Sequence, residues 1–322
     1  MLDRIRVALA AALLQVAPGA GNAQQSSTPF PTKPIRLIVG PGPDAIARII
    51  GQKLTEAWGQ QVVIELQPGA GGVIAAQTVA RAPADGYSLL LTTTSFAIMQ
   101  AMQPKLPFSL LTDFAPVGQV ISAGFVLVAH PSVPATSLDE LIRLAQAKPG
   151  FINCASTGPG TAPHLGCEML RTYAKADVVH VPYNGTPPAV LDLLAGRVHI
   201  LIATGPASVN LVQEGKLKAL AVTGRNRVGA LPQIPTMAEL GRPELEIPGW
   251  NGVHAPAGTP PEVIARLSAE ILKAVGQPEV GDKIRAQGFD PDPRSADAFG
   301  ELVRADVARW TAIVKATGAK PE

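Results

Sequence analysis

The chain has 322 residues, of which 47% are hydrophobic and 16% are charged. This length and composition suit a globular protein with two domains and exclude an intrinsically disordered chain. The formal net charge of +2 gives no indication of a nucleic-acid partner or of binding to an anionic membrane surface. With 31 Gly and 31 Pro, the sequence favours many short strand–turn–helix junctions over a helical bundle.

The first 23 residues have the pattern of an export signal. Arg4 and Arg6 precede the apolar run from Val7 to Leu14, and small residues lead up to Ala23. We expect cleavage there, which gives a mature protein that begins at Gln24 in the periplasm. The apolar run is too short to span a bilayer, so we expect no membrane insertion.

Strands and helices alternate in the first block of the mature chain. The patterns predict strands at 35–39, 62–66 and 87–92 and helices at 44–58 and 73–81. Each strand ends in a turn rich in Gly, Pro, Ser or Thr. This alternation is typical of a parallel sheet covered by helices on both faces.

Glycines follow the second strand and open a helix, as they do in a dinucleotide-binding turn. Ile74 replaces the third glycine of that fingerprint, and the next strand ends without an acidic residue for a ribose. We therefore interpret Gly69, Gly71 and Gly72 as positions of close helix–strand packing.

A second block begins near Phe125 and repeats the alternation. Its predicted strands are 125–129, 151–156, 178–181, 199–203 and 218–223. Capping boxes at 137–140 and 259–262 predict helix starts, and a long amphipathic helix is predicted from Ser295. The C-terminal helices need a sheet to lie on, so we expect the C-terminal segment to cross back onto the first block.

The stretch 151–170 reads as a strand, a Gly/Pro turn and a helix that starts near Pro163. Such a junction directs backbone N–H groups and the positive end of a helix dipole outward, so an anion can bind over 160–164. Side-chain donors there would be Ser156, Thr157, Thr161 and His164. The alternative is an ordinary turn in which Gly and Pro only set the geometry.

The two cysteines lie in the same stretch. Cys167 occupies the fourth position after Pro163, where it should face the sheet as a small apolar residue. We expect Cys154 and Cys167 to be free thiols, although the periplasm is oxidising.

Catalysis is not indicated. Ser156 and His164 lie close in sequence, but the chain has no G-x-S-x-G elbow, so a secreted hydrolase is the less favoured alternative. The five histidines do not have the spacing of a zinc site. We expect no metal and no cofactor.

Short phrases along the whole mature chain resemble those of the Bug-type periplasmic receptors, the solute-binding components of tripartite tricarboxylate transporters. In chain order these phrases are Lys33 to Arg36, Pro68 to Gly72, Asp85 to Tyr87, Asp113 to Pro116, His130 to Pro134, Val181 to Tyr183, Ala230 to Pro232 and Ala255 to Pro260.

The resemblance implies an α/β, two-lobed periplasmic binding protein fold of type II, a Venus flytrap with a mainly parallel sheet in each lobe. Residues 24–123 and 248–322 would form lobe 1, and residues 124–247 would form lobe 2, with crossings near Ser122 and Ile247. A small carboxylate-bearing ligand would be held between the lobes. A monomeric receptor would deliver it to membrane transporter subunits, or alternatively report it to a signalling system.

The resemblance also places the ligand loops. Carried over by position, the ligand-binding residues are Gly40, Gly42, Asp44, Thr93, Thr94, Ser95, Ser156, Thr157, Gly160, Thr161, His164, Tyr183, Gly185, Thr186 and Thr204. The first loop is shorter than is usual in the family, and its Pro41 and Pro43 lack an N–H donor. Ala203 stands where many members carry Asp, which favours a plain carboxylate over an amino acid. We therefore expect lobe 2 to supply most of the carboxylate affinity, with lobe 1 acting mainly as a lid.

Overall fold

A computed structural model describes residues 30–40, 44–67, 69–103 and 105–320. The described residues from Pro31 to Lys320 belong to one compact unit. The predicted export signal lies outside the described residues and stays a prediction. Within the described ranges, none of the helices is both long enough and apolar enough to cross a membrane.

The described strands form one continuous mixed sheet. Its order is β2-β1-β3-β9-β4-β7-β5-β6, and β10 and β8 also pair with β4. The strands are β1 (Ile35–Val39), β2 (Val62–Leu66), β3 (Ser88–Thr93), β4 (Phe114–Ala129), β5 (Ile152–Ser156), β6 (Val178–Pro182), β7 (Ile200–Thr204), β8 (Lys218–Val222), β9 (Pro248–Pro256) and β10 (Asp290–Arg294). We call β1, β2, β3, β9 and β10 the first half of the sheet and β5, β6, β7 and β8 the second half.

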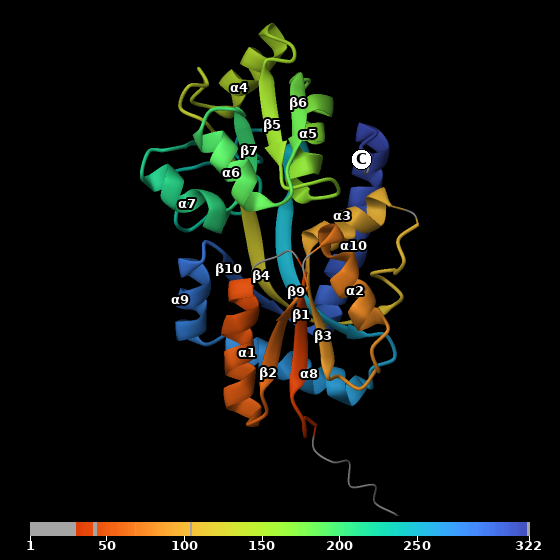
Figure 1. Ribbon diagram of the computed structural model, residues 1–322. Helices are drawn as coiled ribbons and strands as arrows, with labels where there is room; N and C mark the ends of the chain where they lie inside the picture. The colour runs from red at the N-terminus through yellow and green to blue at the C-terminus, as the bar shows by residue number, and fades with distance from the viewer. Residues whose placement is uncertain (1–29, 41–43, 68, 104, 321–322) are drawn as a thin grey trace, which may run out of the picture. The chain divides into compact units, whose positions relative to one another are not determined.

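Ten α-helices are found among the described residues. They are α1 (Asp44–Trp58), α2 (Val73–Ala80), α3 (Thr94–Met102), α4 (Leu138–Ala147), α5 (Ala162–Thr172), α6 (Thr186–Leu194), α7 (Gly205–Gln213), α8 (Pro261–Val275), α9 (Pro278–Ala286) and α10 (Ala296–Thr317). Most of the predicted elements are present, with ends shifted by a few residues. Figure 1 shows the strands and helices of the two halves in different colours along the chain.

Strand β4 joins the two halves. It pairs with β9 as far as Gly124 and with β7 from Phe125 onward. The sequence predicted only its second part, because Pro116, Gly118 and Gly124 interrupt the strand pattern and β-bulges lie between Pro116 and Gly118 and between Gln119 and Ile121. Because β9 and β4 run antiparallel to their neighbours, the sheet is mixed, whereas a mainly parallel one was expected.

Thr223 ties the two places where the chain passes between the halves. Its backbone N–H donates to the carbonyl of Phe125 at 2.8 Å, and its hydroxyl lies 3.2 Å from the carbonyl oxygen of Ile247. Ile247 N–H donates back to the carbonyl of Thr223 at 2.8 Å. Thr223 is fully buried, so these bonds are shielded from water. The exact lobe boundaries expected from the sequence stay a prediction.

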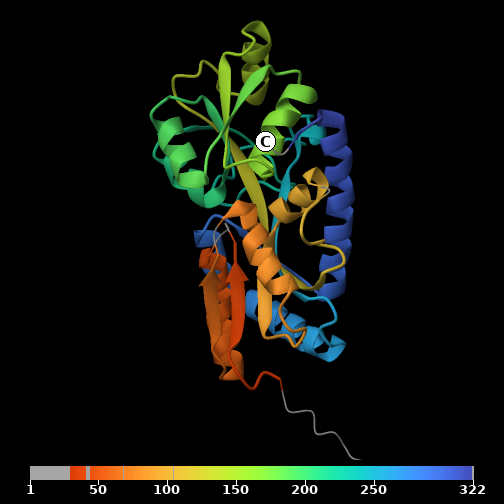
Figure 2. The same ribbon diagram turned by 45° about the vertical axis from the view of Figure 1, so that its right-hand side comes forward.

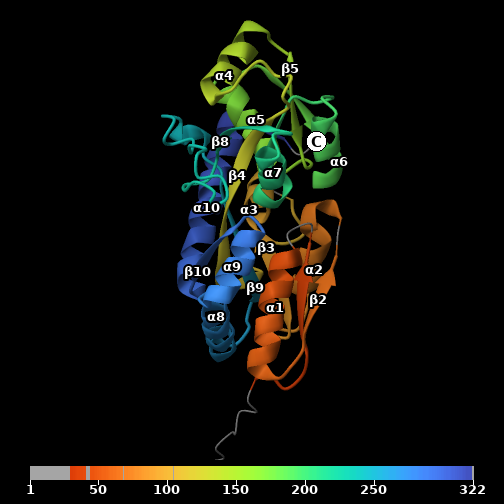
Figure 3. The ribbon, with the colours of Figure 1, turned by 90° about the vertical axis from the view of Figure 1, so that its left-hand side faces the viewer.

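Helix α10 lies against both halves on one face of the sheet. It packs against α3 of the first half and α5 of the second (Figure 2). One buried apolar cluster on this face includes Phe96, Leu127, Leu165 and Trp310, so the core is continuous across both halves. Helices α1 and α9 contact each other away from α10 (Figure 3). We call the two sides of the first half the α10 face and the α1 face.

The C-terminal segment returns to the first half, since β10 pairs with β4 and both α8 and α9 contact α1. Strand β10 was not predicted, because its sequence contains two Asp and two Pro and lacks an apolar pattern. The capping box expected at 259–262 is wrong. The Thr259 hydroxyl donates to the carbonyl of Pro256 at 2.8 Å, and Pro260 stands at the N-cap without a side-chain bond.

The expectation of free thiols is also wrong. Cys154 and Cys167 form a disulfide, with their α-carbons 6.0 Å apart. Cys167 does face the sheet, as its helical position predicts, but the strand beneath it is β5, which carries Cys154. The orientation that buries Cys167 therefore also brings it to its partner.

We expect neither cysteine to react with an alkylating agent when the protein is denatured without reductant. Replacing both by Ala should lower the free energy of unfolding by about 3 kcal/mol, because a short closed loop is released in the unfolded chain. Mass spectrometry and urea denaturation measure the two effects, and reductant should bring the parent to the stability of the variant. Labelled cysteines, or equal stability of parent and variant, would contradict the pairing.

Candidate functional site

The candidate site lies where parallel strands of both halves end. In Figure 1, β1 rises toward the middle of the molecule and β5 descends toward it. The strands β3, β5 and β7 end at Thr93, Ser156 and Thr204, and a helix begins within a few residues of each. This arrangement places loops and helix N-termini from both halves toward one another, which is the usual position of a ligand in open α/β sheets.

The loop after β5 uses several of its predicted donors internally. Gly160 N–H donates to His164 Nδ1 at 3.2 Å, and the Thr161 hydroxyl donates to the carbonyl of Gly158 at 2.6 Å. Thr161 is also the N-cap of α5, where its oxygen accepts from His164 N–H at 3.4 Å. These bonds hold the loop in shape, while Thr157 stays half-buried at its start.

Ser156 is bonded to a histidine that the sequence did not single out. Its hydroxyl lies 2.6 Å from His180 Nε2, and the His180 ring stacks on His164 with centroids 4.3 Å apart. Parallel pairing of β5 with β6 places His180 opposite Cys154, a register that requires knowledge of the strand order. Ser156 is wholly buried, so its hydroxyl is engaged within the chain rather than displayed at the surface of the loop.

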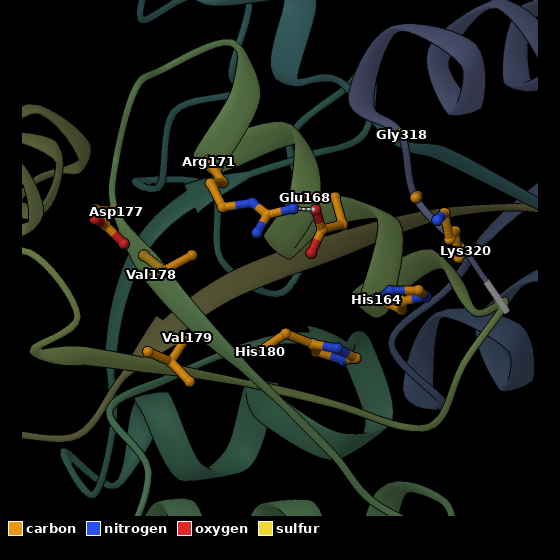
Figure 4. A pocket seen from close by; sticks show the side chains of 10 residues that line it. His164, Glu168, Arg171, Asp177, Val178, Val179, His180, Gly318 and Lys320 are labelled. Atoms are coloured by element: carbon orange, nitrogen blue, oxygen red, sulfur yellow. Dashed lines mark hydrogen bonds and ion pairs between the residues drawn. The ribbon is translucent and has the colours of Figure 1, made fainter. Parts of the chain in front are cut away.

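A pocket of about 420 Å³ lies behind this pair of histidines (Figure 4). It is lined by α5, the edge strand β6 and the segment that follows α10, and it contains the ion pair between Glu168 and Arg171. Of the predicted ligand residues only His164 lines it. The pocket therefore lies beside the predicted site rather than within it.

The loop after β6 directs its aromatic hydroxyl away from the strand ends. Tyr183 donates to Asp192 Oδ2 at 2.8 Å, and its ring packs against the apolar core of the second half. Burial and this hydrogen bond raise the pKa of Tyr183. Gly185 has a φ of 101°, a conformation that glycine adopts without strain, and Thr186 then starts α6. The helix thus begins at Thr186, three residues before the start expected from the sequence, and the Tyr183 hydroxyl is bonded to Asp192 of that helix.

The loop after β7 is covered by the first half of the sheet. Thr204 is the N-cap of α7, and Gly205 follows it. A Cβ on Gly205 would lie 2.1 Å from the carbonyl oxygen of Gly288, in the turn between α9 and β10. Backbone from the two halves is therefore in direct contact at the first turn of α7.

The predicted ligand residues of the first half are hydrogen-bonded within the chain to different degrees. The Thr94 hydroxyl is buried, accepts from Trp250 N–H at 2.8 Å and lies 3.4 Å from the carbonyl oxygen of Pro248. Thr93 caps α3 by accepting from Ser95 N–H at 3.3 Å, and both residues are half-buried. Asp44 starts α1 and pairs with Arg48.

Of the glycines expected to pack closely, Gly72 does so. A Cβ on Gly72 would lie 2.8 Å from the ring of Phe96, and one on Gly40 would lie 3.1 Å from the α-carbon of Gly72. Gly72 is therefore a position of close packing, although its neighbour Phe96 lies in α3 and not in a strand, and a Cβ on Gly71 would lie 3.9 Å from its nearest atom, the sulfur of Met99. Gly42 lies outside the described residues.

The loops of the two halves approach each other at a residue that the sequence analysis missed. A Cβ on Gly160 would lie 4.0 Å from Nε2 of Gln103, the residue that follows α3. No spacing rule relates these positions, because they come together only through the packing of α3 against α5. Among the described residues, no group of three or more His, Cys, Asp and Glu side chains could hold a metal ion.

Comparison with known proteins decides the family. The model of the TctC family, the receptor of tripartite tricarboxylate transporters, matches residues 46–319. The chain belongs to this family. It is 36% identical to protein BugT of Bordetella pertussis over 301 residues, which is 92% of each chain. The resemblance to Bug-type receptors is therefore confirmed.

Two solved structures of similar proteins contain carboxylates. MatC of Rhodopseudomonas palustris, solved with bound malate, has a TM-score of 0.80 and 30% identity, covering 88% of this chain and all of that one. An R. palustris protein solved with adipate has a TM-score of 0.84 and 33% identity, covering 91% of this chain and all of that one. The predicted α/β fold of the periplasmic binding protein class is confirmed, and the TctC relatives are binding proteins rather than enzymes.

A buried histidine next to the end of β3 predicts a pH effect. His254 Nδ1 lies 2.9 Å from the Thr92 hydroxyl, and burial lowers the pKa of His254 to about 3. The unfolded chain binds this proton near pH 6.5. The contribution of neutral His254 to the free energy of unfolding should therefore be fully present above pH 6.5 and should be lost as the pH falls toward 3.

Urea denaturation of the parent and of His254→Gln at pH 7.5 and pH 4.5 measures this effect. The parent should lose about 2–3 kcal/mol more than the variant between the two values, since only the parent must protonate a buried imidazole on unfolding. An equal loss in both proteins would show that His254 is protonated in the folded state.

Proposed function

We propose that this protein is a periplasmic receptor that captures a small carboxylate and delivers it to the membrane subunits of a tripartite transporter. The observation that carries the proposal is the match to the TctC family over residues 46–319. The malate and adipate in the two solved relatives support a carboxylate ligand.

The geometry of the strand ends supports the same ligand class. Helix α3 begins at Thr94, directly after β3, and α6 begins at Thr186, after the short loop that follows β6. Helix N-termini present backbone N–H groups and a positive dipole end, which bind a carboxylate without catalytic chemistry. Ala203 at the end of β7 is buried and apolar, so it offers no acceptor for the amino group of an amino acid. A carboxylate without an amino group fits this site best.

The cellular arrangement follows from the same proposal. Export would depend on the signal in residues 1–23, and the mature receptor would act as a monomer in the periplasm. Contact with the transporter subunits would be transient, because the receptor must return for another ligand.

A thermal-shift screen tests the proposed function. The probes are malate, adipate, succinate and citrate, with aspartate and glutamate as amino-acid controls. A probe present at a hundred times its dissociation constant should stabilise the folded protein by about 2.7 kcal/mol. We expect at least one of the plain carboxylates to do so and both amino acids to have smaller effects.

Mass spectrometry of the recovered ligand separates binding from catalysis, since a receptor returns its ligand unchanged. The proposal fails if none of the carboxylates shifts the melting temperature, or if the bound carboxylate is converted to a product.

A further inference from the structure

A buried amide without a hydrogen-bond partner lies in the middle of the first half of the sheet. Asn251 is 4% exposed, and its side-chain nitrogen Nδ2 is buried without a partner. Buried N–H groups in folded proteins are nearly always hydrogen-bonded, so an unpaired one requires an explanation. Asn251 is not among the residues that the sequence pattern or the family resemblance indicated.

Strand pairing places Asn251 at the level where β3 ends. In the register between β3 and β9, Asn251 lies opposite Thr93, the last residue of β3 and the N-cap of α3. On its other side Asn251 pairs with Ile121 of β4. Strand β1 ends just before this level, with Val39 opposite Leu91. Asn251 therefore lies in the row of residues from which the first-half ligand loops leave the sheet.

The neighbours of Asn251 show which face its side chain occupies. Trp250 Nε1 donates to Asp306 of α10 at 2.7 Å, and a Cβ on Gly252 would lie 2.2 Å from the ring of Phe299, also in α10. Both flanking residues thus point toward the α10 face. Because side chains alternate along a strand, Asn251 and its partner Thr93 point toward the α1 face.

Two of the proposed first-half ligand residues lie on or next to the α1 face. Thr93 shares the face with Asn251, and α1 begins at Asp44, shortly after the end of β1. In the segment between β1 and α1, Pro41 and Pro43 carry no backbone N–H. An unpaired amide N–H at this level can supply a donor that these two residues cannot provide.

We propose that the Asn251 side-chain amide donates a hydrogen bond to a carboxylate oxygen of the ligand and contributes to ligand specificity. The inference rests on the proposed function. It revises the expectation that the first half acts mainly as a lid, because Asn251 gives that half a buried donor of its own. Desolvation strengthens a charge-assisted hydrogen bond of this kind. When no ligand is bound, the buried amide has no partner.

The rival explanation is an ordered water that bonds to Asn251. Gln119, whose Oε1 is also buried without a partner, lies opposite Gly252 and so on the other face of the sheet, which means that such a water would bond to Asn251 and not to Gln119. The two explanations differ in the ligand-free protein. A water-bridged amide stabilises the fold without ligand, whereas an amide reserved for the ligand does not.

The test uses Asn251→Asp, Asn251→Leu and the control Asn210→Asp on the exposed surface of α7. Calorimetric titration is done at pH 7.5 with malate or adipate, whichever binds the parent. Both Asn251 variants should lose at least tenfold in affinity, because Leu removes the donor and Asp replaces it by a charge that repels a carboxylate. Asn210→Asp should bind like the parent, and ligand-free Asn251→Leu should melt at or above the parent temperature.

Affinities of both Asn251 variants within twofold of the parent would overturn the inference. A loss of affinity for Leu alone, with Asp at the parent value, would also overturn it, because it would indicate a packing effect. A marked drop in the melting temperature of ligand-free Asn251→Leu with unchanged affinity would identify the water site instead. If the parent itself bound no carboxylate, the proposed function would fail, a result distinct from all of these.

Discussion

The structure depends on one strand that serves both halves of the sheet. Strand β4 pairs with β9 up to Gly124 and with β7 from Phe125, so the two halves cannot form independently of it. Thr223 links β4 to the second segment that runs between the halves, since it donates to the carbonyls of both Phe125 and Ile247. A Cβ on Gly224 would lie 2.8 Å from the α-carbon of Gly124, so the backbones meet without side chains between them. These contacts set the angle at which the strand ends of the two halves face each other.

The two faces of the molecule are joined in different ways. On the α10 face, one apolar core runs from Phe96 through Leu127 and Leu165 to Trp310, and burial of this kind is costly to break. On the α1 face, the contact between Gly205 and Gly288 involves backbone alone. If the two halves move apart to admit a ligand, the Gly205–Gly288 contact on the α1 face should open first, because it buries less apolar surface than the core on the α10 face. This asymmetry agrees with the polar residues Thr93 and Asn251 pointing toward the α1 face.

Local patterns in the sequence predicted the fold well and the site only in part. Periodicity and caps identified β1, α1 and α4, where Ser137 accepts from Glu140 N–H and the Glu140 carboxylate accepts from Thr136 N–H. The first part of β4 and all of β10 were missed, because their stability comes from pairing and not from β-forming residues. The family resemblance supplied the loop positions expected to bind the ligand, which stay a prediction, and it did not supply the direction of each hydroxyl. The hydroxyls of Thr161, Thr94 and Tyr183 form hydrogen bonds within the chain. The register of the strands, which the sequence does not reveal, brings His180 and Asn251 to the candidate site.

The position of the ligand is the central claim, and a crystal structure of the protein with bound malate or adipate tests it most directly. The account predicts the carboxylate between the strand ends of the two halves, with one oxygen within hydrogen-bonding distance of the Asn251 amide and near Thr93. The alternative position is the pocket lined by His164, Glu168 and Arg171 beside β6. A ligand found in that pocket, with the strand ends empty, would contradict the account.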